Sequence, residues 1–293
     1  MAGGRGGSSF SERAPRGPRL RGEGGLERPQ RSPRPSALAT PAIPEDVTGS
    51  ELDRDIRMAL SSLSSFTAKE VARHLVMIGR LIDDDPEAAW QHALAARARA
   101  ARIGVVREAA GLAAYRAGHY AEALAELRTA RRLTGSDEHL PVMADCERAL
   151  GRPERALAMA AGPEMGRLGV EQRVEMLIVE AGARADLGQL DAAVITLQVG
   201  LLDSRARAPW VARLRSAYAD ALAAVGRDAE ARHWLERAVE ADPDDLSGIG
   251  ERLAELDGVV LEDLEEDADD LEEDADDVHA AEDAADEGHD RRG

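Results

Sequence analysis

The sequence predicts an all-helical fold, namely a helix-turn-helix repeat solenoid with a disordered tail at each end. Three observations lead to this prediction. Apolar side chains in residues 45–256 recur at helical spacing and show no sustained alternation of the kind that marks a half-buried strand. A short turn motif recurs in the same block at near-constant intervals, as in stacked repeats. Charge and composition change sharply at both ends of this block.

The two tails differ from the middle block in composition. Residues 1–44 hold eight Arg and three Glu among Gly, Pro and Ser, for a net charge of +5. Residues 257–293 hold 18 acidic residues and two Arg, for a net charge of −16. Neither stretch has enough apolar side chains to offset the conformational entropy lost on folding, so we expect both to be disordered. The fold is therefore expected in residues 45–256.

A turn recurs five times in the middle block. Its centres lie at residues 84, 118, 151, 188 and 226, which are 34, 33, 37 and 38 residues apart. Glycine stands at the last four centres, where it permits a left-handed helix end at little steric cost. We therefore expect five helical hairpins, the third of them cut short by Gly162 and Pro163.

Mostly small residues flank each turn at fixed distances, and they should let the two helices of a hairpin approach closely. Aromatic residues make up only 3% of the chain, so the core must consist of Ala, Leu, Val and Ile. Five residues after the turns stand Ala89, Ala123, Ala156, Ala193 and Ala231, and seven residues before them stand Met77, Gly111, Ala144, Ala181 and Ala219.

Apolar stripes predict helices that cover the two ends of the array. Leu52, Ile56, Leu60 and Leu63 form the first stripe, and Leu246, Ile249, Leu253 and Leu256 form the last. Thr67–Glu70 has the pattern of a capping box, and Phe66 and Val71 are spaced as a hydrophobic staple. We therefore expect Thr67 to be the N-cap of the first repeat helix.

These residues resemble the tetratricopeptide repeat family over roughly residues 66–244, most closely in Tyr115–Ala130 and next in Ala231–Pro243. The large aromatic residue usual early in the first helix of that repeat is missing from most copies. The resemblance implies a right-handed superhelix whose first helices line a concave groove that binds peptides or helices of other proteins. Carried over position by position, it makes the groove candidates His74, Ile78, Glu108, Leu112, Tyr115, Arg116, Asp145, Arg148 and Asp220.

One subtype of the family is excluded by composition. Members that bind chaperone tails hold a peptide carboxylate with Lys and Asn side chains. This chain has no Asn, and its single Lys, Lys69, lies at a predicted helix start.

Enzyme chemistry is not expected. Cys146 is the only cysteine, which excludes an internal disulfide framework and multi-cysteine metal sites. No His pair has the spacing of metal ligands, and no phosphate-binding Gly loop follows a strand, so we expect neither a metal nor a cofactor. No apolar run approaches the roughly 18 residues that span a bilayer, and no apolar leader is present at the N-terminus. We expect a cytoplasmic protein without a membrane partner.

Two functional hypotheses stay open. The first is a scaffold or adaptor that binds an unidentified protein through the groove. The second is a nucleic-acid- or ribosome-associated factor that uses the basic arm, residues 1–44, in which Gly3–Gly7 resembles an Arg/Gly segment of RNA-associated proteins. The arm has one such copy and a single aromatic residue, Phe10, so the first hypothesis is favoured. A salt titration of RNA binding with and without the arm separates the two.

Overall fold

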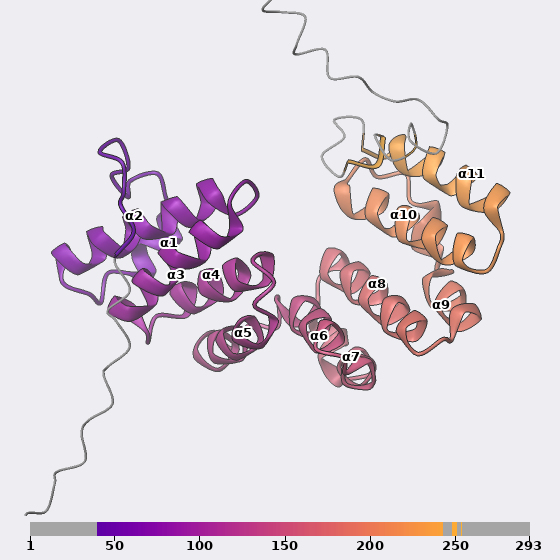
Figure 1. The fold of residues 1–293 in the computed structure, drawn as a ribbon, viewed down its shortest axis with the longest axis horizontal. Helices are drawn as coiled ribbons and strands as arrows, with labels where there is room; N and C mark the ends of the chain where they lie inside the picture. The colour runs from indigo at the N-terminus through magenta and orange to yellow at the C-terminus, as the bar shows by residue number, and fades with distance from the viewer. Residues whose placement is uncertain (1–39, 243–247, 251–252, 254–293) are drawn as a thin grey trace, which may run out of the picture. The chain divides into compact units, whose positions relative to one another are not determined.

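The computed structural model describes residues 40–242, 248–250 and 253, and this part of the chain is helical and contains no strand (Figure 1). The all-helical fold is thereby confirmed. The predicted tails, residues 1–44 and 257–293, lie almost entirely outside the described residues. The α-helices are α1 (Arg54–Ala59), α2 (Ser65–Leu81), α3 (Pro86–Ala100), α4 (Gly104–Arg116), α5 (Tyr120–Thr134), α6 (Leu140–Ala149), α7 (Pro153–Ala160), α8 (Val170–Asp186), α9 (Leu190–Leu197), α10 (Pro209–Ala224) and α11 (Asp228–Val239), and the 3₁₀ helices are η1 (Pro163–Arg167) and η2 (Gly200–Asp203).

All five predicted turns separate two helices that pack against each other, namely α2 and α3, α4 and α5, α6 and α7, α8 and α9, and α10 and α11 (Figure 1). The four turn glycines, Gly118, Gly151, Gly188 and Gly226, have φ angles between 72° and 77°. Each of these four glycine turns closes with the same pair of backbone hydrogen bonds. After Gly118, for example, the N–H of His119 donates to the carbonyl of Ala114 at 2.8 Å. This Schellman ending satisfies carbonyls that the helix end would otherwise leave unpaired.

The first turn has a different chemistry because it lacks glycine. The C-cap of α2, Ile82, has a right-handed helical conformation, and Asp85 caps the N-terminus of α3 by accepting a hydrogen bond from the N–H of Ala88 at 2.9 Å. Pro86 then occupies the first position of α3, where its missing N–H costs nothing.

The predicted N-cap of the first repeat helix, Thr67, is wrong by three residues. Helix α2 begins at Ser65, and its N-cap is Ser64, whose hydroxyl oxygen accepts from the N–H of Thr67 at 3.2 Å. The expected hydrophobic staple does not form, because Phe66 is 76% exposed.

Two of the second helices are short. Helix α7 ends at Ala160, ahead of Gly162 and Pro163 as predicted, and the chain continues into η1. Helix α9 ends at Leu197, and the chain passes through Val199 in an extended conformation into η2. This second interruption was not predicted from the sequence.

The core consists of clusters that share helices. The first cluster runs through α2 to α5 and takes Met143 and Cys146 from α6. The other face of α6 contributes Leu140 and Ala144 to a second cluster with α7 and α8. Helix α8 contributes Val174 to a third cluster with α9, α10 and α11. Because α6 and α8 each bury two faces, successive hairpins are joined through apolar contacts, as in repeat proteins.

The predicted small positions beside the turns are all buried. Ala123, for example, has no exposed surface, and neither do Ala89 and Ala156. A Cβ added at Gly111 would lie 2.5 Å from a methyl carbon of Leu127 and 3.3 Å from its backbone nitrogen. A side chain at Gly111 would therefore force the side chain of Leu127 to shift.

Both ends of the array are covered, as the apolar stripes predict. Leu60 is buried in the first cluster, and Ile249 and Leu253 pack in the third. Leu52, Ile56 and Leu63 pack against the first cluster, whereas Leu246 and Leu256 lie outside the described residues. The segment that precedes α1 also packs on α2, since Val47 is buried beside Val76 and Met77.

Buried charges are tied to partners on neighbouring helices. The carboxylate of Glu126 on α5 accepts from Arg97 of α3 and Arg107 of α4. The carboxylate of Glu147 on α6 accepts from Arg128 of α5 at 2.6 Å. A buried carboxylate is tolerated when it is paired in this way, whereas an unpaired buried charge would be strongly destabilising.

Substituting Leu for Ala123 should lower the free energy of unfolding by about 1–3 kcal/mol, because a larger side chain has no room between α4 and α5. The control Glu122→Leu, on an exposed position of the same helix, should change it by less than about 0.5 kcal/mol. Urea denaturation measures both, and equal losses would show that the packing face of α5 is misassigned.

Substituting Ala for Gly111 should also destabilise the protein, by roughly 1–3 kcal/mol, since the added Cβ overlaps Leu127. The matched change Gly79→Ala lies inside α2 and meets no atom within 4 Å, so it should stabilise the protein by roughly 0.5–1 kcal/mol. Thermal melts of the two variants should therefore shift in opposite directions, and a shared direction would contradict the close approach.

Candidate functional site

A hollow of about 760 Å³ extends across four successive first helices, α4, α6, α8 and α10. We call it the α4–α10 groove. Its wall is made by Leu112, Tyr115 and Arg116 of α4, Pro141, Val142, Asp145 and Arg148 of α6, Glu171, Gln172, Glu175, Ile178 and Val179 of α8, and Pro209 and Arg213 of α10, together with Ile82, Glu138 and His139 from the connections.

A chain of hydrogen bonds crosses the groove from α4 to α8. The hydroxyl of Tyr115 donates to Oδ2 of Asp145 at 2.5 Å, and Nη1 of Arg148 donates to Oδ1 of the same carboxylate at 2.8 Å. Arg148 also donates through Nε to Asp186 of α8 at 2.7 Å. Burial, with the carboxylate of Asp145, raises the pKa of Tyr115 above its usual value, so this phenol stays protonated and remains a donor.

A glycine lets Arg148 reach α8. A Cβ at Gly182 would lie 2.8 Å from Nη1 of Arg148, so the guanidinium rests directly on the helix backbone. This close approach ties α6 to α8 at the end of the groove that holds Tyr115.

The middle of the groove is apolar. Leu112, Val142 and Ile178 are half-buried and come from three different helices, with the more deeply buried Val179 beside Ile178. Leucine- and isoleucine-sized side chains at this depth offer apolar contact area to a docked segment.

The other end of the groove is rich in carboxylates. Glu171 and Glu175 lie one turn apart on α8, and Glu138 lies in the connection before α6. Burial raises the pKa of the Glu175 carboxyl, Arg213 opposes that shift, and the negative charge of Glu171 adds to it. Arg213 donates to Glu175 at 2.5 Å, which joins α10 to α8.

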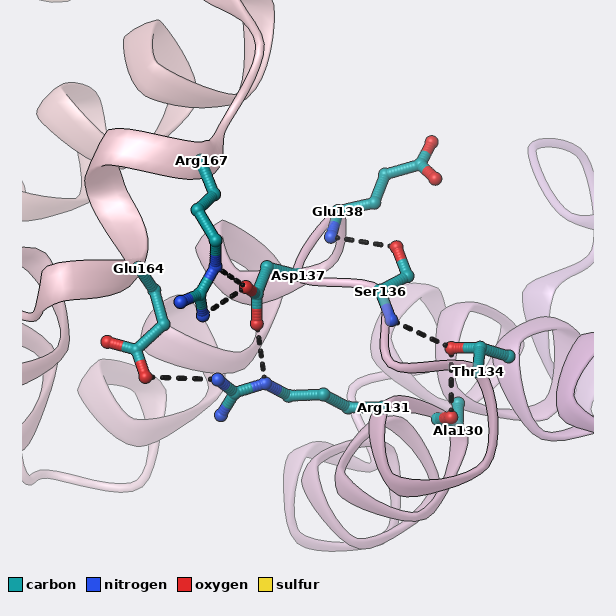
Figure 2. Close-up of polar contacts among 8 residues, drawn as sticks. All are labelled: Ala130, Arg131, Thr134, Ser136, Asp137, Glu138, Glu164 and Arg167. Atoms are coloured by element: carbon teal, nitrogen blue, oxygen red, sulfur yellow. Dashed lines mark hydrogen bonds and ion pairs between the residues drawn. The ribbon is translucent and has the colours of Figure 1, made fainter.

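Beside this end, a separate ion-pair cluster fixes the loop between α5 and α6 (Figure 2). Asp137 accepts from Nε of Arg131 at 2.7 Å and from Nη2 of Arg167 at 2.6 Å, and Arg131 also donates to Glu164 at 3.1 Å. The two guanidinium groups hold the pKa of Asp137 below its usual range against the opposing effect of its burial, which is the largest single influence on that carboxyl. The cluster joins the α5–α6 loop to η1.

Five of the nine groove residues named from the family pattern line the α4–α10 groove, namely Leu112, Tyr115, Arg116, Asp145 and Arg148. Glu108 is half-buried and Asp220 is exposed, and neither lines the groove. The structure therefore brings together the candidates on α4 and α6 that lie nearest the turns.

His74 and Ile78 are placed in the interior instead of at a binding surface. His74 has no exposed surface and Ile78 is 4% exposed. Ile78 belongs to the first core cluster, and Nδ1 of His74 lies 3.0 Å from Nδ1 of His92 on α3. The prediction that these two side chains face a groove is therefore wrong, because both are buried between the first hairpin and its neighbours.

The contribution of α8 and α10 to the groove was not predicted from the sequence. No candidate was assigned on α8, and the one assigned on α10, Asp220, does not line the groove. One available signal was the helical spacing of Glu171, Glu175, Ile178 and Gly182, which places them on one face of α8.

Cys146 does not line the α4–α10 groove. The thiol is fully buried in the first core cluster, and burial, reinforced by Asp145 and Glu147, raises its pKa to about 12. It is therefore protonated at neutral pH and is not a nucleophile there.

Two features, a metal-binding cluster and a membrane-spanning helix, are absent from the described residues. In residues 40–242, 248–250 and 253, no three His, Cys, Asp or Glu side chains are grouped to hold a metal ion. Within the same residues, no helix combines the length and the apolar character required to cross a bilayer. The basic arm of the alternative hypothesis lies almost wholly outside them.

Comparison with known proteins does not assign the chain to a family. No family model matches the sequence, and the curated proteins contain no significant match to it.

The buried histidine pair predicts acid sensitivity. Nε2 of His74 is buried without a partner, which favours a neutral ring that donates through Nδ1 to His92. Burial lowers the pKa of His74 to about 4 from the usual 6.5, and it also lowers that of His92. Between about pH 6.5 and pH 4 the unfolded chain therefore binds protons that the folded chain does not. The free energy of unfolding should fall over this window as pH decreases, by up to about 3 kcal/mol from His74.

Urea denaturation at pH 7.5 and at pH 5 measures this loss. The double variant His74→Leu, His92→Leu should lose less stability on acidification than the wild type, whereas His233→Gln, on the surface of α11, should behave like the wild type. Identical acid dependence in all three proteins would show that the pair does not cause it.

Proposed function

We propose that this chain is a protein-binding scaffold whose five hairpins form a tetratricopeptide-like solenoid, and that it binds a segment of another protein in the α4–α10 groove. The proposal rests mainly on one observation, which is that four successive first helices contribute side chains to a single hollow.

The repeated architecture supports the proposal. The four glycine turns have the same backbone geometry, and first and second helices alternate along the chain. Each hairpin therefore repeats the arrangement of the one before it, and its first helix presents an equivalent face. Repeat proteins of this kind commonly use such a face as an extended binding surface.

The chemistry of the groove also suits a peptide. Tyr and Arg are the side chains most often dominant in interface energetics, and Tyr115, Arg116 and Arg148 line the groove near apolar side chains. Several of these polar groups are held by hydrogen bonds within the protein, so little ordering is required when a partner docks.

The test compares two isoleucines. Ile178 is half-buried in the groove, and Ile195 is 69% exposed on α9, away from it. Short random peptides displayed on phage are selected on the full chain, and the affinities of the selected peptides are measured by fluorescence anisotropy. Ile178→Asp should weaken binding about tenfold or more, because it places a charge under apolar contacts, and Ile195→Asp should leave binding unchanged.

Stability must be separated from binding in this test. The thermal melts of both variants are compared with that of the wild type, and Ile178→Ala, which adds no charge, should reduce affinity without unfolding the protein. Selected peptides that bind equally to the wild type and to Ile178→Asp would overturn the proposed function.

A further inference from the structure

The arginines that line or adjoin the α4–α10 groove are already engaged by carboxylates of the same chain. Arg213 pairs with Glu175 and Arg148 with Asp145 and Asp186. Likewise Arg116 pairs with Asp83 at 3.2 Å, and Arg131 and Arg167 share Asp137. These cations are therefore largely neutralised within the protein.

Two groove carboxylates have no such partner. Among the described residues, no hydrogen bond or ion pair engages the side-chain carboxylate of Glu138 or of Glu171, and both residues are exposed. Figure 2 shows the carboxylate of Glu138 directed away from Arg131 and Arg167. Glu138 also lines a second, smaller hollow together with Gln172, the neighbour of Glu171, so the α5–α6 connection and the start of α8 face the same space.

The half-buried Glu175 adds to this negative end. It lies one helical turn from Glu171, and two like charges at this spacing on one helix repel each other. Arg213 pairs with Glu175, and no ion pair among the described residues engages the other two carboxylates. A cationic side chain placed here would reduce the repulsion and gain Coulomb energy in a partly desolvated site.

We propose that the segment bound in the α4–α10 groove carries Lys or Arg adjoining one or more apolar side chains, with the cation at Glu138, Glu171 and Glu175 and the apolar side chains on Leu112, Val142 and Ile178. This inference rests on the proposed function. Charge complementarity selects against acidic or phosphorylated segments, because their charges would meet the same carboxylates.

The experiment uses the full chain and the phage-displayed random peptides described above. Peptides selected on the wild type should be enriched in Lys and Arg beside apolar residues, relative to the starting library. The double variant Glu138→Gln, Glu171→Gln should bind a selected peptide about five-fold more weakly at low salt, as two partly exposed ion pairs are lost. The same peptide with its cation replaced by Gln should bind both proteins equally.

A charge-matched control is needed because the chain is strongly acidic. Glu122→Gln combined with Asp191→Asn removes two exposed carboxylates outside the groove, on α5 and α9, and leaves the rest of the chain unchanged. Its affinity for the selected peptide should equal that of the wild type. An equal loss in both double variants would mean that net charge alone attracts the cation, and would overturn the inference.

The failures of the two proposals are distinguishable. If no peptide is enriched on the wild type above the level found on Ile178→Asp, the proposed function fails. If peptides that require Ile178 are enriched but carry no excess of Lys or Arg, the proposed function stands and the cationic specificity is overturned. A cation preference that persists unchanged in Glu138→Gln, Glu171→Gln overturns the assignment of the site.

Discussion

The close approach of the two helices in each hairpin is the constraint on which the rest of the structure depends. A chain with 3% aromatic residues cannot fill wide spaces between helices, so stability requires backbones that lie near each other. Alanine or glycine at the crossing positions, such as Gly111 against Leu127, makes this possible. The left-handed glycine turns then set where the second helix begins, and α6 and α8, each buried on two faces, transmit the packing from one hairpin to the next.

Ion pairs between arginine and carboxylate side chains join neighbouring helices, and they determine which charges of the candidate site remain free. Arginine supplies all but one of the 37 basic residues, and its planar group can bridge helices, as Arg148 does between Asp145 and Asp186. Pairs of this kind hold neighbouring helices in register wherever one partner is buried. These pairs neutralise the arginines that line the groove. The carboxylates that remain unpaired therefore make one end of the groove negatively charged.

The candidate site was predictable only where the repeat is regular. Tyr115 and Arg148 lie on α4 and α6, each of which ends at a glycine turn, and both side chains line the α4–α10 groove. Glu175 and Arg213 were missed, since no candidate was assigned on α8 and the one assigned on α10, Asp220, does not line the groove. His74 shows the opposite error, since a polar side chain at a regular position is buried by a matching histidine on the facing helix.

The sequence by itself determined the helical class, the five hairpins and the small crossing positions, because helix periodicity, glycine turns and side-chain volume are local properties that act within one hairpin. It also placed the short third hairpin, since a Gly-Pro pair ends a helix wherever it occurs. Only the tertiary structure decided which polar residues pair, which faces of α2 and α8 are covered, and how the groove is lined. Those outcomes depend on contacts between different helices, such as that of Tyr115 with Asp145, whose geometry follows from the packing of successive hairpins.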